Sequence, residues 1–162
     1  ADKVSGSGVV RELSDGVALP VRDLVNLMIV VSDNTATNLI LEKFGGDAVN
    51  ARMESLGLKN TYVLRKIRGD ANQLKAASGW TRFGSVEENR KWGIGVTTPR
   101  EMVMLLEKLE KGEIVSPEAS KEMIAILKRQ QYTEGIGRRI AHRTASKSGS
   151  LDALRSDVGI VY

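Results

Sequence analysis

The sequence has no cysteine, few aromatic residues and no long apolar run. Without cysteine the chain forms no disulfide and offers no thiol nucleophile or zinc thiolate. No unbroken apolar run is longer than Leu27–Val31, far short of the ~20 residues that a transmembrane helix needs. Aromatic residues make up only 4% of the chain. These absences exclude thiol chemistry, zinc–cysteine sites and a membrane-spanning helix within these residues.

The composition is that of a folded domain with a mild positive charge. The chain has 162 residues, of which 41% are hydrophobic and 27% charged, enough to bury a core and unlike a disordered segment. Lysine and arginine exceed the acids by 24 to 20, an excess that favours solubility. The basic stretch from Arg138 to Arg143 holds the only histidine, His142. Because it lacks interleaved aromatic residues, we predict a solvated face there and no nucleic-acid partner.

Hydrophobic spacing and helix start and stop signals predict five helices. Two are well marked, because Thr98-Pro99-Arg100-Glu101 fits a capping box and Ser116-Pro117 opens the next pattern. Gly45-Gly46 ends an earlier helix. The predicted ranges are 21–31, 35–44, 47–56, 99–112 and 117–131. A strand over residues 27–31 remains an alternative, since periodicity does not separate the two in a short apolar run.

The end of the chain changes to an alternating pattern. Residues 143–150 and 156–162 predict two antiparallel strands. We therefore predict an α+β fold: one domain over 1–162, with a helical lobe over about 20–135, a long omega-type loop at 65–96 and a two-stranded remnant over about 143–162. A lone hairpin is marginal in water, so an exposed edge on 156–162 would favour self-association.

Two short polar motifs stand in these predicted elements. Ser32-Asp33-Asn34 falls at a junction between two helices, and Lys147-Ser148-Gly149-Ser150 falls on a strand. Each alone is a common turn or strand sequence. Together, in this order and with flanks such as Leu24–Leu41 and Val96–Pro99, they resemble the penicillin-recognising serine hydrolases. That family comprises the class A β-lactamases and penicillin-binding proteins, with the motifs S-x-x-K, S-D-N and K-T-G.

The resemblance implies a role for each residue of the first motif. In the family, a serine opens a cyclic amide and becomes acylated, which requires a proton relay to the leaving nitrogen. Ser32 would supply a hydroxyl in that relay. Asn34 would hold the substrate side-chain amide or contact a lysine. Asp33 would be architectural, with its carboxylate bonded to nearby backbone donors.

The second motif would bind the charged end of the substrate. Lys147 would place a positive charge beside Ser32 and attract the substrate carboxylate. Ser148 and Ser150 would add hydroxyl donors, and Gly149 would let the substrate approach the strand. The resemblance implies no cofactor and no metal.

Two family features are missing from the sequence. No serine is followed by lysine three residues later, so the S-x-x-K nucleophile is expected before Ala1, and a final strand and helix after Tyr162. The family's E-x-x-L-N glutamate, which activates the deacylating water, has no match beyond Glu87-Glu88-Asn89. Glu87 and Glu88 are either solvated charges or a deacylation acid.

The resemblance therefore implies a fragment of a class A β-lactamase-like hydrolase that is inactive by itself. One alternative is a penicillin-binding or D-alanyl peptidase relative. Another is a non-catalytic binding module on a degraded hydrolase fold. The implied ligand of the full-length parent is a small molecule, a β-lactam or a D-Ala-D-Ala-like group. Family resemblance also implies export to the bacterial periplasm or the extracellular space, although the chain shows no signal peptide.

Overall fold

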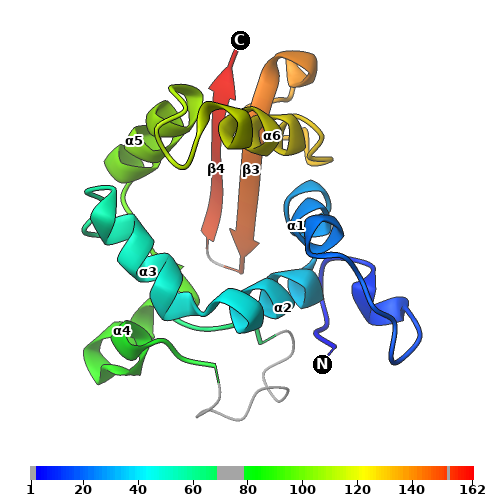
Figure 1. Ribbon diagram of the computed structural model, residues 1–162, viewed down its shortest axis with the longest axis vertical. Coiled ribbons are helices and arrows are strands. Elements are labelled where there is room, and N and C mark those ends of the chain that lie inside the picture. Colours follow the sequence, from blue (N-terminus) through cyan, green and yellow to red (C-terminus); the bar gives the residue numbers. More distant parts are fainter. Residues whose placement is uncertain (1–2, 69–78, 153) are drawn as a thin grey trace. The chain divides into compact units, whose positions relative to one another are not determined.

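The computed structural model describes residues 3–68, 79–152 and 154–162 (Figure 1). The structure combines helices with two separate two-stranded antiparallel sheets, so the predicted α+β class is confirmed. The α-helices are α1 (Val21–Val30), α2 (Asn34–Phe44), α3 (Gly46–Ser55), α4 (Arg82–Ser85), α5 (Pro99–Glu110) and α6 (Pro117–Leu127). The strands are β1 (Tyr62–Val63), β2 (Gly95–Val96), β3 (Thr144–Leu151) and β4 (Leu154–Val161). Short 3-10 helices are η1 (Val10–Glu12), η2 (Glu87–Trp92) and η3 (Ala141–Arg143).

The chain divides into two compact units. Unit 1 contains Ala1–Met28 and Ser32–Glu101, and unit 2 contains Ile29–Val31 and Met102–Tyr162. The division falls inside α1 and α5, so it does not follow the predicted partition of helical lobe and strand pair. The prediction of one domain stays a prediction. In the described part of the chain, no helix has the length and apolarity to cross a bilayer.

The core of unit 1 forms where η1, α1 and α2 meet. Val10, Leu24 and Ala36 are buried there. The partly buried side chains that pack on them are Leu19, Leu27, Met28, Leu39 and Ile40. Phe44 follows Ile40 on the same face of α2 by helical spacing, but it is 53% exposed. Phe44 is the last residue of α2, directly before the Gly45 cap, and so lies beyond the turns that face this core.

A second part of unit 1 is fixed by buried polar side chains. The Asn50 amide of α3 accepts from Val63 N at 2.7 Å and donates to Val63 O at 2.9 Å, which ties α3 to β1. Thr98 caps α5 by accepting from Glu101 N at 3.2 Å. The Glu101 carboxylate, predicted to complete a capping box, instead accepts from Asn60 N and Thr61 Oγ1. These donors satisfy the buried carboxylate without the N-cap backbone.

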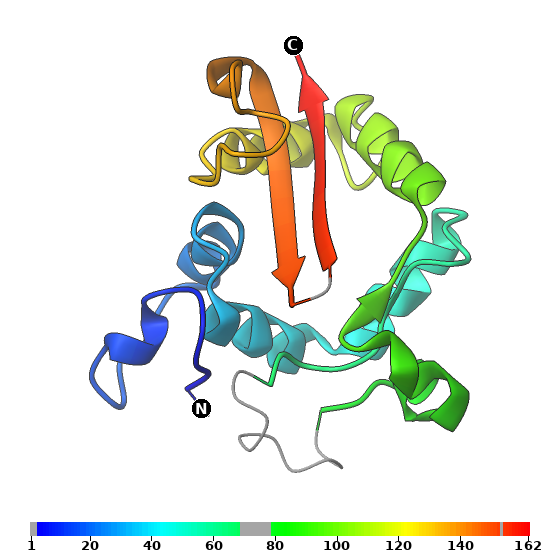
Figure 2. The ribbon, with the colours of Figure 1, turned by 180° about the vertical axis from the view of Figure 1, so that it is seen from behind.

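Unit 2 is built around the β3–β4 hairpin. Its register pairs Lys147 with Val158 and Ser148 with Asp157, and the predicted strand pair is confirmed with slightly different ends. Helix α6 contacts β3 and lies across one face of the hairpin in both views (Figures 1 and 2). Helix α6 ends at Leu127, so the predicted helix over 117–131 is too long. The Gln130 side chain bonds the Tyr132 backbone, which draws the chain away from the helix.

Short elements also occur before α1 and within the predicted omega-type loop. Residues 1–19 include η1, and the described part of 65–96 includes α4, η2 and β2. Strand β2 pairs with β1 in antiparallel register. Thr81 caps α4 by accepting from Gly84 N at 3.0 Å. Residues 69–78 of the predicted omega-type loop lie outside the described residues.

Candidate functional site

Ser32 lies between α1 and α2 with a backbone conformation that serines seldom adopt. Its φ is 55°, a positive value that among the described non-glycine residues occurs at Ser32 alone. This left-handed region costs about 1–2 kcal/mol for an L-residue. The strain persists only when the surroundings hold the residue, which is common at functional sites. The turn is therefore built to set the direction of the Ser32 side chain, which is half-buried.

Asp33 holds this turn from within. Its side chain is 1% exposed, and its carboxylate accepts from Val9 N at 2.6 Å, Val10 N at 2.9 Å and Ala36 N at 2.8 Å. The last of these caps α2, and a carboxylate there also favours the positive end of the helix dipole. The same side chain thus joins η1 to the start of α2.

Asn34 is bound by the segment that precedes η1. Its side-chain amide donates to Ser5 O at 2.8 Å, and its backbone N donates to Ser7 O at 3.0 Å. A Cβ on Gly6 would lie 2.6 Å from the Asn34 amide nitrogen, so glycine permits the close approach. One N–H of Asn34 is committed to the protein, while an amide has a second N–H and an oxygen to offer.

Lys147 lies on β3, as predicted for its motif, and is half-buried. Its Nζ donates to Ser148 O at 2.5 Å. Burial lowers the pKa of Lys147 below its ordinary value, and the attraction of Asp157 opposes the shift. The ammonium is therefore partly stripped of water, which strengthens its interaction with an anion.

The rest of the motif becomes more exposed along the strand. Ser148 is half-buried, while Gly149 and Ser150 are exposed. A Cβ on Gly149 would lie 3.1 Å from Ser156 Oγ on β4. Ser148 and Ser150 alternate with Lys147 and Gly149 along β3, so they point to the opposite face of the hairpin.

The two motifs belong to different units. Ser32, Asp33 and Asn34 lie in unit 1, and the Lys147 motif lies in unit 2. The structure builds each motif separately, and the convergence of Ser32 and Lys147 remains a prediction.

The remaining predicted candidates are on the surface. Glu87 and Glu88 are exposed on η2. His142 is exposed on η3, and Arg138, Arg139 and Arg143 are exposed as well. Within residues 3–68, 79–152 and 154–162, no group of three or more acidic or histidine side chains has the arrangement of a metal site.

Sequence reasoning missed Gln130 and Asp157, which support the Lys147 strand. Gln130 Nε2 donates to the buried Ser146 Oγ at 3.1 Å. Asp157 Oδ2 accepts from Ile136 N at 2.7 Å, while its buried Oδ1 has no hydrogen-bond partner among the described residues. The hairpin register could have placed Asp157 opposite Ser148, but no sequence signal marks Gln130.

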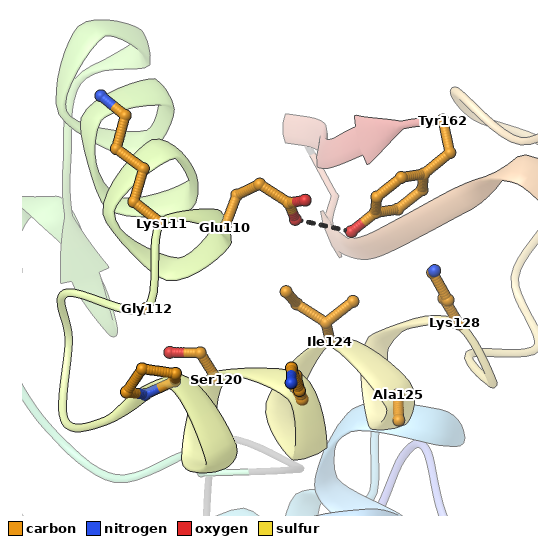
Figure 3. A pocket seen from close by; sticks show the side chains of 10 residues that line it. Glu110, Lys111, Gly112, Ser120, Ile124, Ala125, Lys128 and Tyr162 are labelled. Atoms are coloured by element: carbon orange, nitrogen blue, oxygen red, sulfur yellow. Dashed lines mark hydrogen bonds between the residues drawn. The ribbon is translucent and has the colours of Figure 1, made fainter.

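A crevice of about 360 Å³ lies between α5, α6 and the end of β4, and it contains none of the predicted site residues (Figure 3). Tyr162 donates to the Glu110 carboxylate at 2.7 Å, and Lys128 Nζ lies 3.8 Å from the Tyr162 ring centroid. Burial and the bond to Glu110 raise the pKa of Tyr162 to about 12. The phenol therefore stays protonated and bridges α5 to the end of β4.

Comparison with solved structures identifies the fold. A crystal structure of a β-lactamase from Sphaerobacter thermophilus is 35% identical, with a TM-score of 0.82 over 99% of this chain and 56% of that chain. The structure of PBP-A is 22% identical, with a TM-score of 0.77 over 97% of this chain and 52% of that chain. An ancestral class A β-lactamase is 24% identical, with a TM-score of 0.71 over 99% of this chain and 58% of that chain. The fold is thus that of the class A β-lactamases and PBP-A.

The family is shown by sequence as well. The model of the β-lactamase enzyme family matches residues 1–162, and the chain belongs to that family. None of the curated proteins matches it. The chain spans about half the length of the solved relatives.

Proposed function

We propose that the chain supplies the S-D-N and K-S-G motifs of a serine hydrolase that opens β-lactam amides through an acyl-enzyme. The observation that carries this proposal is the positive φ of Ser32, held by the buried Asp33 carboxylate. A family motif that keeps a strained residue in a fixed turn is under a functional constraint. Family membership supplies the reaction class.

Contacts within unit 2 connect the end of α1 with the strand that carries Lys147. The last residues of α1 belong to this unit, and Val30 O accepts from Gln131 N at 3.0 Å. The neighbouring Gln130 bonds Ser146, which precedes Lys147. Ser32 follows Val30 by two residues. Within unit 2, the end of α1 and the strand that carries Lys147 are therefore both bonded to the short segment after α6.

The proposed chemistry uses Ser32 as a proton carrier and Lys147 as a fixed charge. The nucleophilic serine oxygen attacks the amide carbonyl, the C–N bond breaks, and the leaving nitrogen takes a proton through the Ser32 hydroxyl. Lys147 binds the substrate carboxylate. The attacking serine is not among the serines of this chain in its S-x-x-K pattern. We therefore expect no turnover from these residues alone.

Incubation with a chromogenic cephalosporin tests this expectation. The purified chain should give no hydrolysis above a heat-inactivated sample, and intact mass should show no acyl adduct. Turnover or a stable adduct on the wild-type chain would show that another residue attacks the amide. Either result would contradict the proposal that these residues supply two motifs but not the attacking serine.

Noncovalent β-lactam binding tests the proposed convergence of Ser32 and Lys147 directly. Ser32→Ala and Lys147→Ala should each weaken binding by about tenfold, the value of one charge-assisted hydrogen bond. The double variant should lose less than the sum of the two, with a coupling above about 0.5 kcal/mol. Lys121→Ala, at an exposed lysine of α6, is the control. Silent Ser32 and Lys147 variants would contradict the proposal and favour a non-catalytic binding module.

A penicillin-binding or D-alanyl peptidase relative is the second candidate. Glu87 and Glu88 stand exposed on a 3-10 helix, without the E-x-x-L-N pattern. An acyl-enzyme would then form and persist, because no positioned glutamate activates water. In a chain extended to contain the S-x-x-K serine, a β-lactam adduct that survives for hours by intact mass would support this candidate. Rapid release would favour a β-lactamase.

We further propose that the β4 edge allows self-association and that the protein is exported. Among the described residues β4 pairs with β3 alone, and Leu154 and Val161 are 58% and 51% exposed. Unpaired strand edges invite pairing with another chain. Sedimentation should show a concentration-dependent dimer that Val161→Lys weakens. The proposal of export rests on family membership, because β-lactamases are typically exported proteins. Fractionation of the source cells tests it.

A further inference from the structure

Three arginine side chains gather around Trp80 in unit 1. The guanidinium carbons of Arg65, Arg68 and Arg90 lie 5.5, 5.7 and 5.9 Å from the ring centroid. Three positive charges therefore share one indole, within about one Debye length of each other (~10 Å at 0.1 M salt). The cation–π contacts offset part of their mutual repulsion, and an anion would offset the rest.

The backbone beneath the arginines is fixed. The Asn38 side chain, which is 6% exposed, donates to Ile67 O and accepts from Ile67 N, both at 2.8 Å. Arg65 forms an antiparallel bridge with Trp80. These bonds place two arginines and the tryptophan on one scaffold, so their proximity is set by the fold.

The three guanidiniums are not neutralised by described carboxylates. Arg65 Nη1 donates to Lys66 O at 3.0 Å, and Arg90 Nη2 donates to Ser85 O at 3.1 Å. Both acceptors are uncharged backbone carbonyls. Burial, together with the nearby charge of Arg68, lowers the pKa of Arg65 below its ordinary value. The cluster thus retains its positive charge among the described residues.

Two acids that line a crevice beside the cluster have partners of their own. A crevice of about 330 Å³ is lined by Arg65 and Trp80, and also by Glu42 and Asp47. Glu42 forms an ion pair with Lys66 at 3.3 Å. Asp47 accepts from Arg82 N at 2.8 Å and lies 3.6 Å from Arg82 Nε. These pairs offset the charges of Glu42 and Asp47.

We propose that Arg65, Arg68 and Arg90 around Trp80 bind the phosphate group of an anionic ligand. A guanidinium presents a planar fork of donors that matches phosphate and carboxylate oxygens. Three guanidiniums donate more hydrogen bonds than the two oxygens of one carboxylate accept. A phosphate offers more oxygens and up to two negative charges. The phosphate belongs either to a small soluble molecule or to a lipid headgroup.

Tryptophan fluorescence gives a direct readout of this cluster. Trp80 and Trp92 are the two tryptophans of the chain, so Trp92→Phe leaves Trp80 as the reporter. Inorganic phosphate should change its emission with saturation, at constant ionic strength set by sodium chloride. Succinate should bind more weakly. A linear response to phosphate, or succinate binding as tight as phosphate, would overturn the assignment.

Charge-removing variants assign the effect to the cluster. Arg68→Gln and Arg90→Gln should each weaken phosphate binding by about tenfold. Arg138→Gln removes an exposed charge in unit 2 and should leave binding unchanged. Arg65→Lys keeps the charge but loses the fork, and it should also weaken binding. Unfolding curves confirm that each variant is folded. Equal losses in Arg68→Gln and Arg138→Gln would reduce the effect to net charge and overturn the site.

Vesicles separate the two sources of phosphate. Co-sedimentation with phosphatidylglycerol vesicles that the Arg68→Gln/Arg90→Gln variant loses, and that inorganic phosphate competes away, would assign a lipid headgroup. Phosphate binding without co-sedimentation would assign a soluble ligand. Co-sedimentation that the double variant retains would contradict the proposal.

Discussion

The aspartates Asp33 and Asp157 show how differently the two units hold their motifs. Asp33 is 1% exposed and accepts three backbone N–H bonds around the Ser32 turn. Asp157 lies opposite Ser148 and accepts from Ile136 N, while Oδ1 is buried without a partner among the described residues. The Ser32 motif is therefore supported by a carboxylate with three hydrogen bonds. The Lys147 motif lies in a strand pair in which the Asp157 carboxylate is only partly hydrogen-bonded. We expect the Ser32 turn to be intolerant of change and the Lys147 strand to be tolerant.

The largest expected effect is at Asp33. Asp33→Ala removes the acceptor of three buried or half-buried N–H groups, and each donor left unpaired costs about 1–3 kcal/mol. Partial relaxation should limit the loss in unfolding free energy to about 3–5 kcal/mol, measured by urea denaturation. Asp152→Ala, at an exposed turn between β3 and β4, should change it by less than about 0.5 kcal/mol. Similar losses in both variants would erase the distinction between the two units.

Gly8 gives the next effect, because it packs against the same carboxylate. Its φ is 107°, and a Cβ would lie 2.2 Å from Asp33 Cγ. Gly8→Ala should cost about 3 kcal/mol through backbone strain and displacement of Asp33. Gly16 has a φ of 82° but nothing within 4 Å of an added Cβ, so Gly16→Ala should cost only about 1 kcal/mol. Equal thermal midpoints would show that the Asp33 contact is not rigid.

The features that the sequence predicted correctly are those that depend on residues close together in the chain. The α1–α2 junction, the start of α6 and the β3–β4 pair follow from helix caps and from alternation along a strand. Strand β1 has only two residues, and its partner β2 lies across the 65–96 segment, so no local pattern reveals the pairing. Two of the three bonds of Asp33 also join residues 24 and 23 positions apart in the chain. Such partners are fixed by tertiary structure and cannot be read from spacing.

Glu101 tests the same contrast through pH. Burial alone would raise its pKa, but bonds from Thr61, Asn60 and the Lys59 backbone together lower it below the ordinary value. Because the pKa of Glu101 is lower in the folded state than in the unfolded state, the ionised carboxylate stabilises the fold at pH values above the unfolded-state pKa. That stability is lost as the pH falls through the folded-state pKa. The wild type should therefore lose stability from about pH 5 to about pH 3 more steeply than Glu101→Gln. Glu88→Gln, at an exposed residue of η2, should keep the wild-type slope. A Glu101→Gln curve parallel to wild type would contradict the network.

Lys147 should give the smallest effect, and its pH dependence falls in the alkaline range. Burial lowers its pKa, with Asp157 opposing, so near the folded pKa the unfolded chain binds more protons than the folded one. Stability then rises with pH through the window between the folded pKa and the ordinary value of 10.5. Lys147→Met should flatten this rise between about pH 8 and about pH 11 and change stability at neutral pH by less than about 1 kcal/mol.

Lys111 supplies the matched control in the same unit. Its bond to Glu107 raises its pKa. The stability from this pair is therefore present at pH values below the unfolded-state pKa of Lys111 and is lost as the pH rises through its folded-state pKa. Lys111→Met should therefore shift the slope of the unfolding free energy in the direction opposite to Lys147→Met. If both variants shifted it the same way, general surface charge would explain the result. The partly dehydrated ammonium that the proposed substrate-carboxylate site requires would then be absent from β3.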